Sequence, residues 1–103
     1  MHIAPALRLR IADICRRYHV RSLQLFGSAA IGAERPDSDI DLLVEFIPGE
    51  APGGFALIDM QDELSEAFDG RRIDLAFPSV LHNAYRRHAI EPQLQSQPPL
   101  FQQ

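Results

Sequence analysis

The 103-residue sequence contains no lysine and a single cysteine. Because all ten basic residues are arginine, a P-loop lysine and a lysine Schiff base are both excluded. The lone Cys15 excludes an internal disulfide and a cysteine-cluster metal site, and we interpret it as a small hydrophobic residue buried under a helix. No apolar run approaches the ~20 residues of a membrane span, and the N-terminus has no signal-peptide core. We therefore expect a cytoplasmic protein that does not contact a membrane.

Acidic residues are concentrated in the middle of the chain. Residues 1–33 hold five arginines and one aspartate (+4), residues 34–69 hold eleven acids and one arginine (−10), and residues 70–103 hold four arginines and two acids (+2). The resulting net charge of −4 argues against a general nucleic-acid-binding protein, which would normally show a basic surface. We expect the acidic block of residues 34–69 to form the solvated face of a helix and part of a cation site.

Hydrophobic periodicity alternates along the chain between the helical repeat and the two-residue repeat of strands. This order predicts an α+β fold in which helices cover a small mixed β-sheet. One domain should span residues 1–91, and the Gln- and Pro-rich residues 92–103 should form a disordered tail. In the last helix, Tyr85 is predicted to lie on the inward stripe, and Pro92 should end the helix. The predicted helices are 4–19, 29–33, 55–68 and 80–90, and the predicted strands are 20–26, 39–46 and 71–77.

The stretch from Leu25 to Phe46, LFGSAAIGAERPDSDIDLLVEF, organises the rest of the chain. Asp39 and Asp41 lie two residues apart at the start of a strand, so both side chains project to the same face, with Cα atoms ~6.6 to 6.8 Å apart. Two carboxylates on one face repel each other unless a cation neutralises them. Oxygen ligands favour Mg²⁺, which takes its remaining ligands from water and substrate phosphates. The pair therefore predicts a magnesium site.

Gly27 and Ser28 follow the preceding strand and have the character of a phosphate site. Glycine lets a phosphate approach the backbone closely, and Ser28 can cap a short helical turn whose free N–H groups face an anion. Gly27-Ser28 ends one strand and the aspartate pair begins the next, so both reach one ligand only if these strands are antiparallel neighbours. We predict a nucleotide held between this corner and the metal ions.

Asp74 lies within the apolar strand RRIDLAF, where a carboxylate is costly to bury unless it is paired or binds a metal. We interpret Asp74 as a third carboxylate beside Asp39 and Asp41. The alternative is a partly exposed edge residue paired with Arg71 or Arg72. If the three aspartates converge, the predicted chemistry is two-metal transfer of a nucleotide, in which Asp74 helps to deprotonate the acceptor hydroxyl.

The order Gly-Ser, ten residues, Asp-x-Asp resembles the signature of the polymerase-β-like nucleotidyltransferases, and specifically of the minimal nucleotidyltransferase (MNT) antitoxins that pair with HEPN-domain toxins. The resemblance covers most of the chain and implies the nucleotidyltransferase fold. It implies that Gly27 and Ser28 bind the nucleotide, and that Asp39, Asp41 and Asp74 are catalytic and bind two Mg²⁺ ions. It further implies the antitoxin of a type VII HEPN/MNT-like toxin–antitoxin pair, which transfers AMP from ATP to a tyrosine hydroxyl of the HEPN toxin and forms a hetero-oligomeric complex with it.

The chain departs from this family at Ala29 and Ile31, because members often read GSRARG and both arginines that could touch phosphate are missing. The departure leaves an alternative open, namely a catalytically weak antitoxin that neutralises its toxin by direct binding, with the acidic block covering a basic surface. A nucleotidyltransferase acting on RNA or a small molecule is another alternative. The 103 residues leave little room for the additional recognition domain that such an acceptor normally needs.

Overall fold

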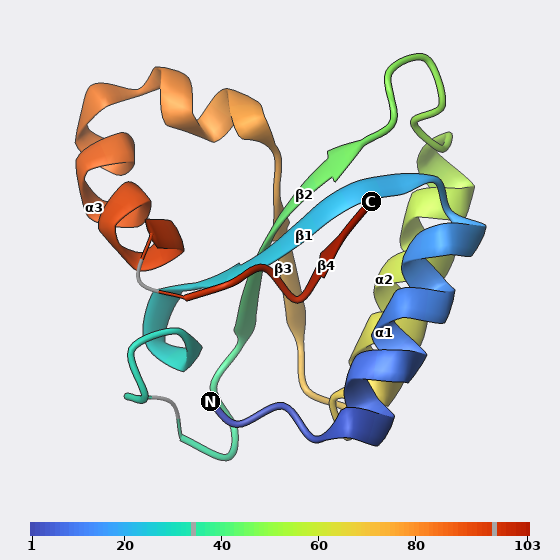
Figure 1. Cartoon of the computed structure of the whole chain (residues 1–103), viewed down its shortest axis with the longest axis horizontal. Helices are drawn as coiled ribbons and strands as arrows, with labels where there is room; N and C mark the ends of the chain where they lie inside the picture. Colours follow the sequence, from blue (N-terminus) through green and yellow to red (C-terminus); the bar gives the residue numbers. More distant parts are fainter. Residues whose placement is uncertain (34, 96) are drawn as a thin grey trace.

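The computed structural model describes residues 1–33, 35–95 and 97–103. Helices cover a four-stranded mixed sheet with the strand order β3-β2-β1-β4, which confirms the predicted α+β fold (Figure 1). The elements are α1 (Pro5–Arg17), β1 (Val20–Phe26), the 3₁₀ helix η1 (Gly27–Ala29), β2 (Ile40–Phe46), α2 (Gly54–Ala67), β3 (Ile73–Ala76), the 3₁₀ helix η2 (Pro78–His82), α3 (Ala84–Gln95) and β4 (Phe101–Gln102).

Strands β1 and β2 are antiparallel neighbours, as the position of the two sequence motifs predicts. Phe26 is paired with Asp41 in this register, so the next residue, Gly27, lies beside the aspartate. Strand β3 runs parallel to β2, with α2 as the connection between them, and Asp41 is the register partner of Asp74. The sheet topology therefore brings the glycine corner and two of the three predicted aspartates to one place.

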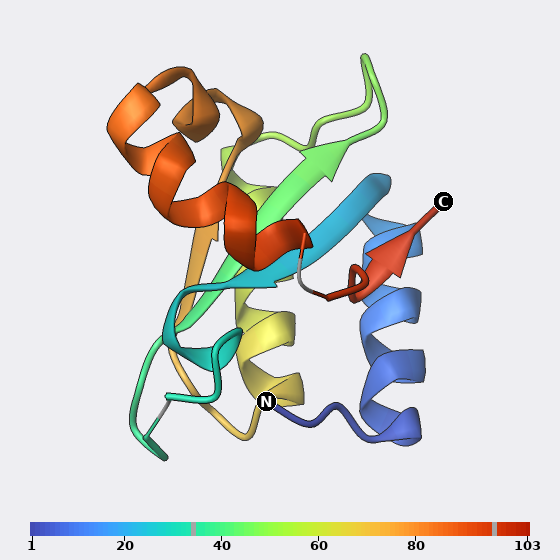
Figure 2. The ribbon, with the colours of Figure 1, turned by 60° about the vertical axis from the view of Figure 1, so that its left-hand side comes forward.

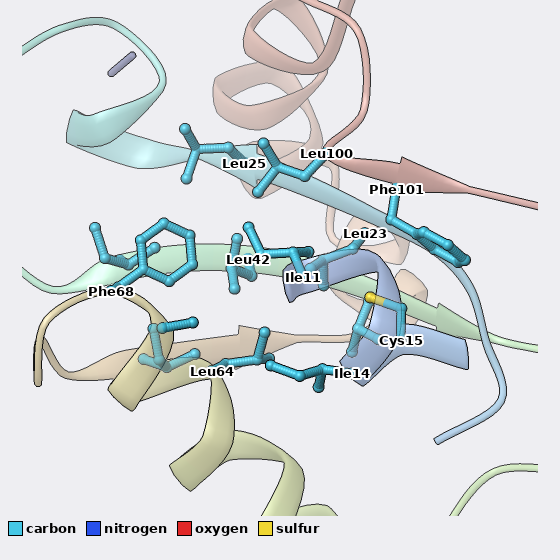
Figure 3. Close-up of a cluster of buried hydrophobic side chains, with 14 of the residues drawn as sticks. Ile11, Ile14, Cys15, Leu23, Leu25, Leu42, Leu64, Phe68, Leu100 and Phe101 are labelled. Atoms are coloured by element: carbon cyan, nitrogen blue, oxygen red, sulfur yellow. The ribbon is translucent and has the colours of Figure 1, made fainter. Parts of the chain in front are cut away.

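The two faces of the sheet carry different layers (Figure 2). Helices α1 and α2 lie on one side of the sheet and α3 lies on the other (Figures 1 and 2). The main core lies under α1 and α2, and its central side chains include Ile11, Leu23, Leu42 and Leu64 (Figure 3). A smaller cluster, made by Phe26, Leu43 and Ile90, seats α3 on the opposite face. This second face carries Asp41 and Asp74, because side chains two residues apart share a face.

Cys15 is buried in the main core, which confirms its interpretation as a small hydrophobic residue. Burial raises the pKa of its thiol to about 12, so the thiol is neutral and unreactive at physiological pH. Within the residues that the structure describes, no helix is long and apolar enough to cross a membrane.

Two helix predictions are wrong in their boundaries. The short helix expected at 29–33 is instead the 3₁₀ helix η1, which begins at Gly27. The helix expected at 80–90 is divided at Asn83, whose backbone is extended and whose Oδ1 accepts a hydrogen bond from the N–H of Arg86 (3.1 Å). Helix α3 then continues through Pro92, because Ile90 and Leu94 on either side of it pack against the sheet.

The prediction of a disordered tail over 92–103 is also wrong for the residues that the structure describes; Ser96 lies outside them. Residues 92–95 complete α3, and Phe101 and Gln102 form β4 against β1. Leu100 and Phe101 are each only 7% exposed. Composition predicted disorder, but two apolar residues at the end of the tail cover the otherwise open edge of β1.

Candidate active site

Asp41 and Asp74, here called the acidic pair, face α3 from adjacent parallel strands. The pKa of Asp41 is raised above its usual range, first by burial and then by repulsion from Asp74. The charge of Asp39 acts in the same direction, while Arg86 opposes it. Asp41 therefore holds its proton more tightly than an ordinary aspartate does in the absence of a cation.

Asp39 precedes β2 and is exposed, as Asp74 is, and its charge acts on Asp41. In residues 1–33, 35–95 and 97–103, no group of three or more His, Cys, Asp or Glu side chains is placed to hold a metal ion. The acidic pair nevertheless fits Mg²⁺, because a cation would relieve the repulsion between the two carboxylates. Mg²⁺ also binds through one or two carboxylates together with substrate phosphates rather than in an all-protein cage.

Gly27 and Ser28 are here called the Gly-Ser corner, and Gly27 lies directly against Asp41. Gly27 has φ +74°, and a Cβ atom at this position would lie 2.1 Å from Oδ2 of Asp41. Both the backbone conformation and the space taken by Asp41 therefore require glycine here. Ser28 and Ala29 complete η1, a single turn that is stabilised by the Ala30 N–H bond to Gly27 O (3.1 Å).

The N–H of Gly27, which we expected to face a phosphate, donates a hydrogen bond to Oε1 of Gln93 in α3 (2.8 Å). This contact ties α3 to the Gly-Ser corner. A phosphate oxygen can accept from the same N–H only after the Gln93 side chain has moved aside.

Two cavities lie between α3 and the sheet, and Phe26 and Arg86 line both. The first, here called the Asp74 cavity, has a volume of about 400 Å³, and its walls include Asp74, Phe77, Ser79 and Val80. The second, here called the Tyr85 cavity, has a volume of about 280 Å³, and its walls include Gly27, Tyr85, Ile90 and Gln93. Arg86 therefore lines both a cavity that contains a carboxylate and a cavity that is mainly apolar.

Arg86 and Gln93 are the residues that the sequence analysis missed. Within the described part of the chain, the guanidinium of Arg86 forms no ion pair or hydrogen bond, although its charge acts on Asp41. The sequence showed that two family arginines are absent at positions 29 and 31. The sequence did not indicate that α3 would place Arg86 near the Gly-Ser corner, because this position depends on which face of the sheet α3 covers.

The fold is α+β, and its sheet places a pair of carboxylates beside the Gly-Ser corner. This combination is typical of the nucleotidyltransferase class. The chain belongs to the nucleotidyltransferase domain family, whose model matches residues 9–95. This confirms the family that the sequence motifs predicted.

Individual relatives agree with this assignment. Protein adenylyltransferase MntA of Thermococcus cleftensis is 38% identical over 78 residues, which are 76% of this chain and 76% of MntA. A solved structure provisionally described as a minimal nucleotidyltransferase gives a TM-score of 0.64 at 30% identity, covering 82% of this chain and 83% of its own. A crystal structure of a toxin–antitoxin with AMP-PNP gives a TM-score of 0.62 at 23% identity, covering 93% and 73%, and supports the fold. The chain is thus a minimal nucleotidyltransferase.

Proposed function

We propose that this protein is the antitoxin of a toxin–antitoxin pair and that it transfers AMP from ATP to a tyrosine hydroxyl of a HEPN-domain toxin. The observation that carries the proposal is the acidic pair, held on adjacent strands against the Gly-Ser corner. The protein adenylyltransferase name of the Thermococcus relative favours a protein acceptor, and the toxin–antitoxin neighbour favours a toxin.

The Asp74 cavity suits the acceptor side chain. Its apolar walls, which include Phe77 and Val80, can bury a phenol ring, and Asp74 lies beside them as the group that takes the hydroxyl proton. The phenol oxygen attacks the α-phosphate, the bond to the β-phosphate breaks, and pyrophosphate leaves. Because Asp74 is exposed in this structure, it can also release the proton to solvent afterwards.

The triphosphate is assigned to the Gly-Ser corner and Arg86. Arg86 supplies the positive charge that Ala29 and Ile31 do not, and it lines both cavities. Asp39 and Asp41, with Asp74, are assigned to hold Mg²⁺, which supplies charge neutralisation at the phosphates when bound. The chain's own contribution is to orient the reacting groups and to accept the proton.

A second candidate function is neutralisation of the toxin by direct binding. Two observations favour it: the described residues include no three-ligand metal cluster, and Gln93 occupies the N–H of Gly27. The acidic outer face of α2 would then cover a basic surface of the toxin.

Intact-mass measurement of the toxin, taken as the product of the neighbouring gene, separates these functions. Incubation with this protein and Mg-ATP should add one or more AMP groups to the toxin. Asp41→Asn combined with Asp74→Asn should slow the labelling by more than ~100-fold, since loss of an outer-shell partner alone costs 10- to 100-fold. Asp37→Asn, which changes an exposed loop carboxylate, is the matched control. Full neutralisation of an unmodified toxin by the double variant would refute catalysis and support direct binding.

A further inference from the structure

We propose that the Tyr85 cavity holds the base of the nucleoside triphosphate and that the ring of Tyr85 stacks on this base. The inference rests on the proposed function, because it assigns the base of a nucleotide whose phosphates lie at the Gly-Ser corner.

The Tyr85 cavity adjoins the proposed phosphate site. Gly27 and Arg86 line the Tyr85 cavity, and the same two residues are assigned to the triphosphate. The Asp74 cavity is the other space beside Arg86, but it contains the carboxylate that takes the acceptor's proton. A nucleotide with its reacting phosphate between the two cavities can therefore place its base in the Tyr85 cavity and leave the Asp74 cavity to the acceptor.

The walls of the Tyr85 cavity combine apolar side chains with a polar one. Phe26, Ala89 and Ile90 provide an apolar lining, and the side-chain amide of Gln93 provides a polar edge. In the nucleotide-free protein, the hydrogen bond from the N–H of Gly27 to Oε1 of Gln93 holds this amide at the cavity wall. A nucleobase has the same combination, with flat apolar faces and a hydrogen-bonding edge. Small-molecule sites are typically apolar cavities with a few placed polar groups.

Tyr85 is exposed, in contrast to the inward position that we predicted. It is 84% exposed, although it stands on a helix that packs closely on the sheet five residues later at Ile90. Within residues 1–33, 35–95 and 97–103, its ring takes part in no ring-stacking or cation–π contact. A large aromatic face left open at the rim of a cavity is suited to stacking on a base, which requires only a π-face.

The test measures binding of two ligands by calorimetry in the presence of Mg²⁺. A non-hydrolysable ATP analogue has a base, and inorganic tripolyphosphate does not. Tyr85→Ala should weaken binding of the analogue by about 5- to 150-fold, the range measured for stacking of a base on an aromatic side chain. Tyr85→Phe keeps the ring and should bind like the wild type. Ala89→Trp adds bulk at an exposed position on the cavity wall and should also weaken binding of the analogue.

All three variants should bind tripolyphosphate as the wild type does. Unchanged binding of the analogue by both Tyr85→Ala and Ala89→Trp would overturn this inference and leave the proposed function standing. An equal loss of affinity for the analogue and for tripolyphosphate would also overturn the inference, because the cavity would then not be specific for the base. If Ala89→Trp prevented toxin binding but not nucleotide binding, the cavity would belong to the partner. A wild-type protein that binds neither ligand would refute the proposed function itself.

Discussion

The side chain of Asp41 fills the space beside Gly27 at the end of β1. A Cβ atom on Gly27 would lie 2.1 Å from Oδ2 of Asp41. The strand register creates this contact, since Asp41 is paired with Phe26, the residue before the glycine. The Gly-Ser corner and the carboxylate of Asp41 are therefore one packed unit rather than two independent sites.

Gly27→Ala should displace the carboxylate of Asp41 and abolish transfer of AMP. It should also reduce the free energy of unfolding by about 1 to 3 kcal/mol, because alanine at positive φ is strained. Gly32→Ala is the control, since Gly32 has the same φ of +74° and an added Cβ there meets nothing within 4 Å. Denaturant unfolding and the toxin-labelling assay measure the two effects. Equal activity of the two variants would show that the position of Asp41 does not matter.

The contribution of Asp41 to the stability of the metal-free protein should fall as the pH rises through the acid range. Burial and Asp74 raise the pKa of Asp41, so between the usual aspartate pKa of about 3.9 and this raised value the folded state holds more protons than the unfolded state. The stability that this proton contributes is present at low pH and is lost as Asp41 ionises.

Thermal melting in EDTA from pH 4 to pH 8 checks this. Asp41→Asn should be more stable than the wild type at pH 7 and should depend less on pH. Mg²⁺ should stabilise the wild type at pH 7 more than it stabilises Asp41→Asn. If ionisation of Asp41 made the wild-type protein more stable, the raised pKa of Asp41 would be contradicted.

Arg86→Ala should weaken binding of both the ATP analogue and tripolyphosphate, because the guanidinium is assigned to the phosphates. A hydrogen bond to a charged group contributes about 1.5 to 3 kcal/mol, which corresponds to about 10- to 150-fold in affinity. Arg87→Ala removes an equal charge from the next residue, which does not line either cavity, and should have little effect. Calorimetry at fixed ionic strength compares the two. Equal losses would indicate a general charge effect.

Gln93→Leu should strengthen phosphate binding by up to about 10-fold, because it frees the N–H of Gly27 without emptying the cavity wall. The same variant should lower the free energy of unfolding by about 1 kcal/mol, since a hydrogen bond between α3 and the corner is lost. Gln95→Leu, at an exposed position of the same helix, is the control. Calorimetry with tripolyphosphate measures the phosphate affinity of both variants. If affinity does not change while stability falls, phosphate does not use this N–H.

Phe101→Ala should destabilise the protein by about 3 kcal/mol or more, because it removes a side chain that is 7% exposed and packs in the main core. Gln102→Ala changes the exposed neighbour in the same short strand and should be nearly neutral. Chemical denaturation compares the two variants with the wild type. A neutral Phe101→Ala would mean that the C-terminal strand contributes nothing to the fold in solution.

The sequence predicted the helices and strands that carry a strong apolar period. Ile11 and Ile14 on α1, and the alternation around Asp74 in β3, identified their buried faces correctly. It also predicted that the strands before Gly27 and after Asp39 are antiparallel neighbours, because both ends had to reach one ligand. The predicted element boundaries were wrong where local sequence preferences competed with packing. Pro92 did not end α3, and the burial of Leu100 and Phe101 orders the Gln-rich tail.

What the sequence determined by itself is the family and the residue types of the site, because a glycine, a serine and three aspartates at these spacings suit few chemistries. Tertiary structure alone decided which groups meet. The parallel register pairs Asp41 with Asp74, and α3 brings Arg86 and Gln93 to the corner from more than fifty residues away in the chain. The physical reason is that strand alternation fixes the face on which a side chain lies, whereas the helix that covers this face is chosen by the burial of distant apolar residues.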